Sequence, residues 1–184
     1  MPIPHALMTL AEWEALPEDN AGHVELQEGV LVVSPKPARR HQDALLALAW
    51  SVRQQLPPRW QALFDFEVVV RAETPAIVRA PDLVVVPRGG AQMRVAASEV
   101  LIAVEIISPG SRGIDTVLKP FEYAGAGIPH YWVVDLDPPV PSITVFGLGA
   151  PGDGYVESQR ATGELVTSVP FPLRIDVAGL VEAP

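Results

Sequence analysis

Two short apolar runs, each interrupted by a single acid, limit what this chain can fold into more than any other feature. They are Pro-Asp-Leu-Val-Val-Val at 81–86 and Leu-Ile-Ala-Val-Glu-Ile-Ile at 101–107. Short runs of mostly β-branched residues, bounded by Pro or Gly, are typical of buried strands. Burying a carboxylate in such a strand costs free energy unless the charge has a partner. If the two strands pair, Asp82 and Glu105 could share one cation, and this is the central hypothesis from the sequence.

The composition is that of a globular protein, with 48% hydrophobic and 19% charged residues among 184. This length suits one domain over 1–184 with a core of its own. No apolar stretch reaches the roughly 18 residues of a membrane helix, and the first residues lack the basic start and apolar segment of a secretion signal. We therefore expect a cytoplasmic protein without membrane contact. The chain has no cysteine, which excludes disulfides and thiolate metal sites.

Local patterns predict short helices and strands along the whole chain. Helices are expected where apolar residues recur at helical spacing, and strands where β-branched residues cluster between turn signals. The segment 87–98 is expected to be a loop, with at most a short helical piece. This order of elements predicts a mixed α/β (α+β) domain built on one central sheet. The expected helices span 9–16, 41–55 and 115–126, and the expected strands are a hairpin over 23–33 that turns near Glu28-Gly29, then 63–71, the two acid-bearing runs, 130–135, 143–146 and 173–177.

The two acids each admit a structural and a functional interpretation. Glu105 lies inside an unbroken apolar run, which leaves no polar alternation to explain it as an exposed edge residue. It is either a metal ligand or a buried acid paired with an arginine, such as Arg79 or Arg71. Asp82 is either a ligand of the same metal or a turn residue at the start of its strand, after Pro81.

Lys119 stands out because the chain contains 11 arginines but only two lysines. A lysine kept in such a composition suggests a need for a compact ammonium group, which could act near a metal-bound water. The structural alternative is an i,i+4 ion pair with Asp115 on a helix. Pro120 leaves the direction of the Lys119 side chain open, because a helix that begins at Pro120 would place Lys119 just before it.

Glu25 and His41 are two further candidates. Glu25 lies on the predicted first hairpin, where it is either a third carboxylate of the site or a solvated strand position. His41 begins the predicted second helix, where a histidine either acts as a ligand or lies at the surface as a capping residue. The net charge of −9 counts against strong non-specific DNA binding, which depends on Lys and Arg. The sequence contains no Gly-rich phosphate loop, zincin histidine pair or Gly-x-Ser-x-Gly elbow.

Taken together, several stretches of the chain resemble the Uma2-like endonuclease family, which belongs to the restriction-endonuclease-like, PD-(D/E)xK superfamily. The resemblance covers most of the chain, from about residue 9 to about residue 180. The combined string from Glu105 to Asp135 is specific, whereas each piece alone would be weak. The stretches that carry the resemblance are 24–29, 34–41, 81–82, 105–109, 115–119, Tyr123, 127–129 and 131–135.

The resemblance implies a restriction-endonuclease-like core, in which a central mixed β-sheet is flanked by helices, and a site for Mg²⁺ or Mn²⁺. Asp82 and Glu105 match the metal-binding acids of the superfamily. In that scheme the main-chain carbonyl of Ile106 would complete the protein ligands. Glu25 matches an acid that lies near the N-terminus in this family and that would assist the two metal-binding acids.

One position departs from the pattern of the superfamily. Its lysine would stand two residues after Glu105, where this chain has Ile107. The resemblance therefore implies that Lys119, from the following helix, is the substitute. In this role Lys119 would stabilise developing charge or help to deprotonate a water.

The two acids and the resemblance together imply an endonuclease that hydrolyses phosphodiester bonds of DNA with Mg²⁺ or Mn²⁺, and double-stranded DNA is the expected partner. Restriction-endonuclease-like domains often pair, so we expect a homodimer or a higher homo-oligomer. Two other functions stay open: a non-catalytic oligomeric binding or scaffold protein of the same fold, and a metal-dependent hydrolase of a small phosphorylated molecule. An electropositive groove of DNA width would favour the nuclease, a closed small pocket the small-molecule hydrolase, and a Glu105 neutralised by arginine the scaffold.

Overall fold

The computed structural model describes residues 7–17, 23–90, 92–108, 110–137 and 139–181. No helix in these ranges is long and apolar enough to span a membrane. The helical segments are α1 (Leu10–Glu14), α2 (Arg39–Gln55), the 3₁₀ turn η1 (Ala97–Glu99), the π-helical turn η2 (Ile114–Leu118), α3 (Lys119–Gly125) and the 3₁₀ turn η3 (Ala178–Leu180). The strands are β1 (His23–Gln27), β2 (Val30–Ser34), β3 (Trp60–Phe64), β4 (Glu67–Arg71), β5 (Ile77–Arg79), β6 (Leu83–Pro87), β7 (Arg94–Ala96), β8 (Ile102–Ile106), β9 (His130–Asp135), β10 (Ser142–Leu148), β11 (Tyr155–Ala161), β12 (Glu164–Thr167) and β13 (Leu173–Asp176).

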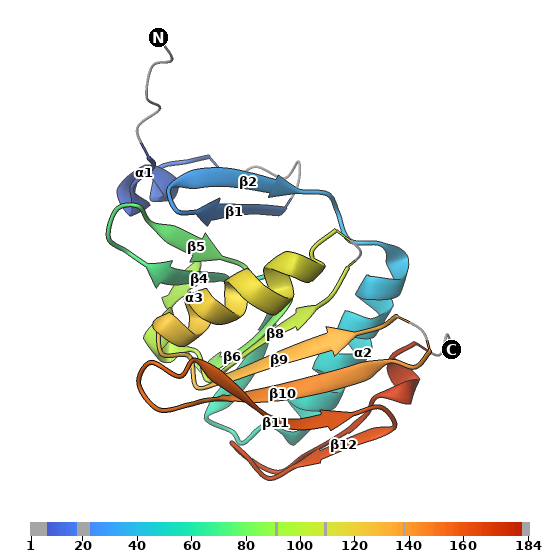
Figure 1. Ribbon diagram of the computed structural model, residues 1–184. Helices are drawn as coiled ribbons and strands as arrows, with labels where there is room; N and C mark the ends of the chain where they lie inside the picture. The colour runs from blue at the N-terminus through green and yellow to red at the C-terminus, as the bar shows by residue number, and fades with distance from the viewer. Residues whose placement is uncertain (1–6, 18–22, 91, 109, 138, 182–184) are drawn as a thin grey trace.

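A six-stranded sheet lies at the centre of the molecule, in the order β11-β10-β9-β8-β6-β3 (Figure 1). Its neighbouring strands are antiparallel except β8 and β9, which are parallel and are connected through η2 and α3. A parallel pair requires such a crossover, which places α3 against the sheet. The mixed α/β fold class and the mixed central sheet predicted from the sequence are confirmed.

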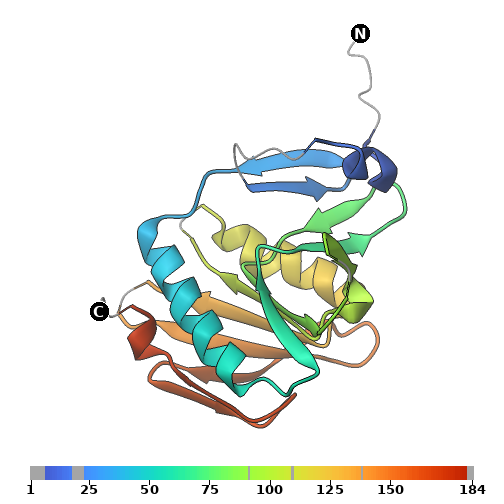
Figure 2. The same cartoon turned by 180° about the vertical axis from the view of Figure 1, so that it is seen from behind.

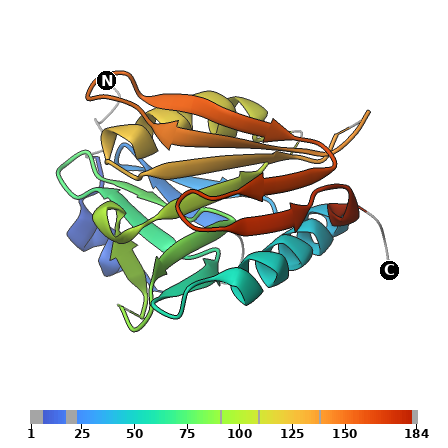
Figure 3. The same cartoon turned by 90° about the horizontal axis from the view of Figure 1, so that it is seen from below.

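Different elements cover the two faces of this sheet. One face packs against α2 and the β12–β13 hairpin, in a core that includes Leu48 and Val104. The other face packs against α3, in a core that includes Ala103 and Tyr123. Figures 2 and 3 show α2 on one side of the sheet and α3 on the other. Because successive side chains of a strand point to opposite faces, Glu105 points to the face that carries α3.

A second sheet of five strands, in the order β2-β1-β5-β4-β7, lies beside α3 together with α1. Its β1–β2 hairpin turns at Glu28 and Gly29, as predicted, with φ angles of 48° and 77°. A two-residue loop with positive φ at both positions matches the twist of the flanking strands. The antiparallel pairing of β1 with β5, in which Leu26 lies opposite Val78, brings Glu25 next to Arg79.

The prediction of a single strand over 63–71 is wrong. The chain bends there, and β3 joins the edge of the six-stranded sheet while β4 joins the five-stranded sheet. Asp65 takes the bend with a φ of 48°, a conformation that Asp adopts more readily than most residues. The predicted loop over 87–98 contains η1 and also the short strand β7, which pairs in parallel with β4.

The helix predicted over 115–126 begins at Ile114 and contains the π-helical turn η2. At its end the N–H of Lys119 donates to the carbonyl of Ile114, five residues earlier. The ring of Pro120 would clash with a carbonyl four residues before it in a regular α-helix, and the wider π-helical turn avoids this contact. Lys119 is therefore the first residue of α3 inside a continuous helical segment, and not a residue that precedes the helix.

We expect Gly29→Ala to destabilise the protein for two reasons. The φ of 77° is strained for any residue with a Cβ, and a Cβ there would approach the Leu7 Cβ to 2.7 Å and the Met8 nitrogen to 3.0 Å. The expected loss is about 1–3 kcal/mol in the free energy of unfolding, measured by urea denaturation. Gly127→Ala is the control, because Gly127 has a φ of 82° but no atom within 4 Å of the added Cβ. Equal losses in both variants would contradict the role of the Leu7 contact.

Candidate active site

Asp82 and Glu105 come together because β6 and β8 pair in antiparallel register. Leu83 lies opposite Val104, so one further step along the ladder places Asp82 opposite Glu105. The Ile106 N–H donates a hydrogen bond to Asp82 Oδ2 over 2.7 Å. The predicted pairing of the two acid-bearing strands is thus confirmed, and it brings the two carboxylates to one end of the central sheet.

The Glu105 carboxylate is buried, and only 3% of the residue is exposed. Its Oε1 accepts hydrogen bonds from Lys119 Nζ and from the Tyr123 hydroxyl, each over 2.9 Å. Burial raises the pKa of Glu105 to about 8, against the opposing effect of the Lys119 ammonium. The nearby carboxylates of Asp82 and Asp115 raise this pKa further. Burial is thus the main reason that ionising Glu105 is costly, and the neighbouring carboxylates add to that cost.

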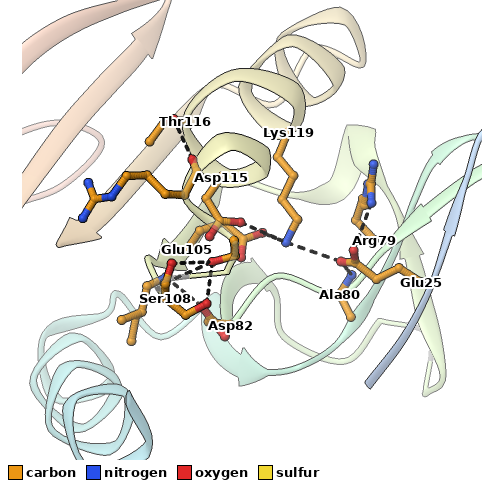
Figure 4. A network of polar contacts seen from close by, with 12 residues as sticks. Glu25, Arg79, Ala80, Asp82, Glu105, Ser108, Asp115, Thr116 and Lys119 are labelled. Carbon is orange, nitrogen blue, oxygen red and sulfur yellow. Dashed lines mark hydrogen bonds and ion pairs between the residues drawn. The ribbon is translucent and has the colours of Figure 1, made fainter. Parts of the chain in front are cut away.

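The Lys119 ammonium lies among three carboxylates, those of Glu25, Glu105 and Asp115, which we call the carboxylate cage (Figure 4). Its Nζ is 2.9 Å from Glu105 Oε1, 3.4 Å from Glu25 Oε1 and 3.5 Å from Asp115 Oδ1. Burial lowers the pKa of Lys119, but the carboxylate cage outweighs burial and raises the pKa above its ordinary value. The i,i+4 ion pair of Lys119 with Asp115, which was the structural alternative from the sequence, is present. Lys119 makes this contact in addition to its contact with Glu105.

Glu25 is a buried residue, with 5% exposure, and not a solvated strand position. Its Oε2 accepts a hydrogen bond from Arg79 over 2.9 Å, and its Oε1 accepts one from the Ala80 N–H over 3.1 Å. Burial raises the pKa of Glu25, but the hydrogen bond from His23 and the charges of Lys119 and Arg79 lower it below its ordinary value. Glu25 is therefore held in its ionised form.

Neither arginine considered as a partner of Glu105 is paired with it. Arg79, which is 1% exposed, donates two hydrogen bonds to Glu122 over 2.7 and 2.8 Å in addition to its bond with Glu25. Such a planar, two-point pair is geometrically specific. Because Glu122 lies on α3, Arg79 connects α3 to the five-stranded sheet. Arg71 instead donates to the Pro75 carbonyl over 2.8 Å.

His41 lies in the first turn of α2 with its Nε2 3.2 Å from Asp82 Oδ2. Burial lowers the pKa of His41, but the hydrogen bond and the charge of Asp82 outweigh burial and raise it. A cavity of about 660 Å³ lies beside His41 and Asp82. The structure brings together all the site residues predicted from the sequence, since the cavity is lined by Glu25, His41, Asp82, Glu105, Ile106 and Lys119.

Sequence reasoning did not assign Asp115 and Tyr123 to the site. Both lie on the helical segment that carries Lys119, and positions 115, 119 and 123 are four residues apart. This spacing places the three side chains on one face of a helix, so the signal was present in the sequence. The link from Arg79 to Glu122 had no such signal, because it joins two elements that are distant in the chain.

The donor atoms of Asp82 and Glu105 fit a hard divalent cation. Among the described residues, the hydrogen bonds of these acids use Asp82 Oδ2 and Glu105 Oε1, which leaves Asp82 Oδ1 and Glu105 Oε2 free. Mg²⁺ and Mn²⁺ prefer such oxygen ligands. Within the described ranges, no group of three or more His, Asp or Glu side chains is arranged to hold a metal ion. A cation here would therefore need main-chain, water or substrate oxygens as well.

Comparisons with known proteins agree with this architecture. A family model named Uma2 and described as "Putative restriction endonuclease" matches residues 10–178. The fold is similar to the crystal structure of "a putative nuclease belonging to DUF820" from Anabaena variabilis ATCC 29413, with a TM-score of 0.71 and 16% sequence identity. The match covers 95% of this chain and 97% of that chain, and it confirms the predicted restriction-endonuclease-like fold. No curated protein matches the chain.

His23 provides a pH-dependent part of the stability next to the site. Its Nδ1 lies 2.6 Å from Asp65 Oδ1 and its Nε2 lies 3.6 Å from Glu25 Oε1. The hydrogen bonds to Asp65 and Glu25 outweigh burial and raise the pKa of His23 from 6.5 to about 10. Because the folded-state pKa exceeds the unfolded one, this stabilisation is complete below pH 6.5 and is lost as the pH rises through about 10.

We therefore expect His23→Gln to lower the free energy of unfolding by about 1–2 kcal/mol near pH 6, and by much less near pH 10. Urea denaturation of both proteins across this range measures the difference. His130→Gln is the control, because burial lowers the pKa of His130 and reverses the sign of the trend. A loss that does not change with pH would contradict the assignment and indicate that His23 acts through packing alone.

Proposed function

Because the chain belongs to the Uma2 family, whose model covers residues 10–178, we propose that it is a metal-dependent endonuclease that hydrolyses phosphodiester bonds of double-stranded DNA. The observation that carries the proposal is the meeting of Asp82, Glu105 and Lys119 beside one cavity. Two carboxylates can hold a cation, and an ammonium group can stabilise charge that develops on a phosphate.

Asp82 and Glu105 would hold Mg²⁺ or Mn²⁺ through their free oxygens, with the main-chain carbonyl of Ile106 as a further donor. Few protein ligands suit Mg²⁺, which usually keeps several waters and binds phosphate oxygens of the substrate. When bound, the cation would polarise the scissile phosphate and acidify a water. The carboxylates of Asp82 and Asp115, which add to the effect of burial in raising the pKa of Glu105, would be neutralised in part by a bound cation.

Lys119 would act as a fixed positive charge and not as a base. The carboxylate cage raises its pKa and so keeps the ammonium protonated, and a protonated ammonium has no lone pair to accept a proton. Its Nζ is 2.9 Å from Glu105 Oε1, so a phosphate bound beside Glu105 would lie within its electrostatic reach. Lys119 would thus replace the lysine that the superfamily carries at the position of Ile107.

His41 and Glu25 would act through their neighbours. His41 contacts Asp82 and would orient its carboxylate, leaving Oδ1 toward the cation. Glu25 contacts Lys119 and would keep the ammonium in place. Lys36 also lines the cavity and could contact a DNA phosphate. A homodimer would supply one such site for each DNA strand.

A non-catalytic binding protein of the same fold is the second candidate. The net charge of −9 and the ion pair that already balances Glu105 favour it. Glu105 is paired with a lysine, although an arginine would serve a purely structural role as well. This choice of partner favours the nuclease. The third candidate, a hydrolase of a small phosphorylated molecule, would be expected to have a closed pocket. The Asp82 side chain is instead 22% exposed, so a polymer such as DNA could reach this carboxylate from solvent.

The first test is thermal unfolding with and without millimolar Mn²⁺ or Mg²⁺. We expect Mn²⁺ at about 100 times its dissociation constant to raise the melting temperature by about 5–10 °C. Glu105→Gln should abolish this shift, because it removes a charged ligand. Glu164→Gln is the control, because it makes the same change at an exposed acid that pairs with Arg174, away from the cavity. An unchanged wild type, or an equal shift in Glu105→Gln, would contradict the proposed metal site.

Lys119→Met should lower the cleavage rate of plasmid DNA at saturating DNA and Mn²⁺ by about 100-fold or more, because it removes the fixed charge. The rate is measured by the conversion of supercoiled plasmid to nicked and linear forms. Lys36→Met makes the same change at the other lysine of the chain, and should weaken DNA binding more than it lowers the maximal rate. A Lys119→Met protein that cleaves as fast as the wild type would refute the assigned role of Lys119.

A further inference from the structure

The π-helical turn that precedes α3 deprives the carbonyl of Asp115 of its regular main-chain donor. In this turn the Lys119 N–H donates to Ile114, so the next N–H, from residue 120, would be the donor for Asp115. Residue 120 is a proline and has no N–H. A buried carbonyl without a donor costs free energy, and Asp115 is only 2% exposed.

The Tyr131 hydroxyl supplies the missing donor. Its oxygen lies 2.6 Å from the Asp115 carbonyl oxygen, and Tyr131 is fully buried. Tyr131 lies on β9, directly opposite Ala103 of β8 in the parallel register. The hydroxyl therefore fastens the helical turn to the same pair of strands that carries Glu105.

This contact lies where the geometry of the site is set. Asp115 belongs to the carboxylate cage, and its side chain is 3.5 Å from Lys119 Nζ. Lys119 is the next residue after η2, and Tyr123 follows one turn later and donates to Glu105. A shift of the π-helical turn would consequently move the three side chains of this helix face relative to Glu105.

We propose that Tyr131 is a positioning residue, whose hydroxyl replaces the absent N–H of Pro120 and thereby holds Lys119 and Asp115 against Glu105. The functional part of this inference rests on the proposed function, since it concerns the same site. The structural part stands on the hydrogen bond, the proline and the burial of the turn.

The test uses Tyr131→Phe, which removes the hydroxyl and keeps the ring. That ring is packed against Tyr155, with 5.6 Å between the ring centroids. Tyr155→Phe is the matched control, because it removes a hydroxyl that donates over 2.8 Å to Ile128, which lies beyond the other end of α3. Both variants lose one hydrogen bond in the same aromatic cluster, and only Tyr131→Phe releases the Asp115 carbonyl.

The readout is acetylation of Lys119 by an N-hydroxysuccinimide acetate ester, followed by mass spectrometry. The other lysine, Lys36, is exposed and serves as the internal reference for reagent and time. We expect the rate ratio of Lys119 to Lys36 to rise about fivefold or more in Tyr131→Phe, as the turn loosens. In Tyr155→Phe the ratio should stay within about twofold of wild type. An unchanged ratio in a folded Tyr131→Phe protein would overturn the inference.

A second pair of variants tests the link to Pro120 and covers the case in which Tyr131→Phe is poorly folded. Pro120→Ala restores an N–H to the helix, so the Asp115 carbonyl no longer depends on the hydroxyl. The drop in melting temperature caused by Tyr131→Phe should therefore be smaller in the Pro120→Ala background than in the wild type. Equal drops in both backgrounds would overturn the inference.

These readouts need neither metal nor DNA, so they separate the two proposals. We expect Tyr131→Phe also to reduce the Mn²⁺-induced rise in melting temperature. If labelling is unchanged while Glu105→Gln loses its Mn²⁺ response, the positioning role is overturned and the proposed metal site stands. If labelling rises and the wild type does not respond to Mn²⁺, the structural role of Tyr131 is supported and the proposed function fails.

Discussion

Glu105 places a carboxylate on a central strand, where water can no longer solvate it. The ion pair with Lys119 and the hydrogen bond from Tyr123 replace that lost solvation. Both partners come from one helical segment, which must therefore lie across this face of the sheet. The acid and the helix that covers it are thus mutually dependent, since the helix buries the charge and also supplies the groups that balance it.

The rest of the architecture follows from keeping that helix in place. The parallel pairing of β8 and β9 requires a crossover on one face, and the crossover contains η2 and α3. The five-stranded sheet then closes over α3, where Arg79 binds Glu122 of the helix and Glu25 of β1. A buried ion network of this kind adds less to stability than its contacts suggest, because each charge has been desolvated. What it does provide is a defined position for the Lys119 ammonium among several carboxylates.

Much of the site could be predicted from the sequence because Glu105 lies within an otherwise apolar strand and Asp82 directly precedes another. That contrast between a charged residue and its surroundings is visible at Asp82 and Glu105 without any structure. Lys119 was identified from its rarity in an arginine-rich chain and from the resemblance to a known family. Its direction was not predictable, because a proline after a lysine is typical of a helix start, and the π-helical turn that accommodates Pro120 depends on a hydroxyl from another element.

The division of 63–71 shows a different limit. The residues on either side of Asp65 both have a strand pattern, because each side belongs to a sheet. The hydrophobic pattern therefore does not reveal that the chain bends at Asp65 and passes from one sheet to the other. The three-residue strands β5 and β7 are too short to show a pattern of their own. Arg79 could be suggested as a partner for a buried acid, but its choice of Glu25 and Glu122 is a property of the packed sheets. Local sequence specifies which residues need partners, and tertiary packing decides which partners they receive.

The network around Arg79 also bears on how the protein folds. Its ion pairs connect residues 54 and 43 positions apart in the chain. Closing such long loops carries an entropic cost that must be met before the contacts form, and structures rich in non-local contacts fold slowly. During synthesis Glu25, Asp82 and Glu105 all emerge before Lys119. An incompletely folded chain then carries Glu105 without the Lys119 counter-charge, and the arrangement needed for the proposed chemistry arises only when α3 docks between the two sheets.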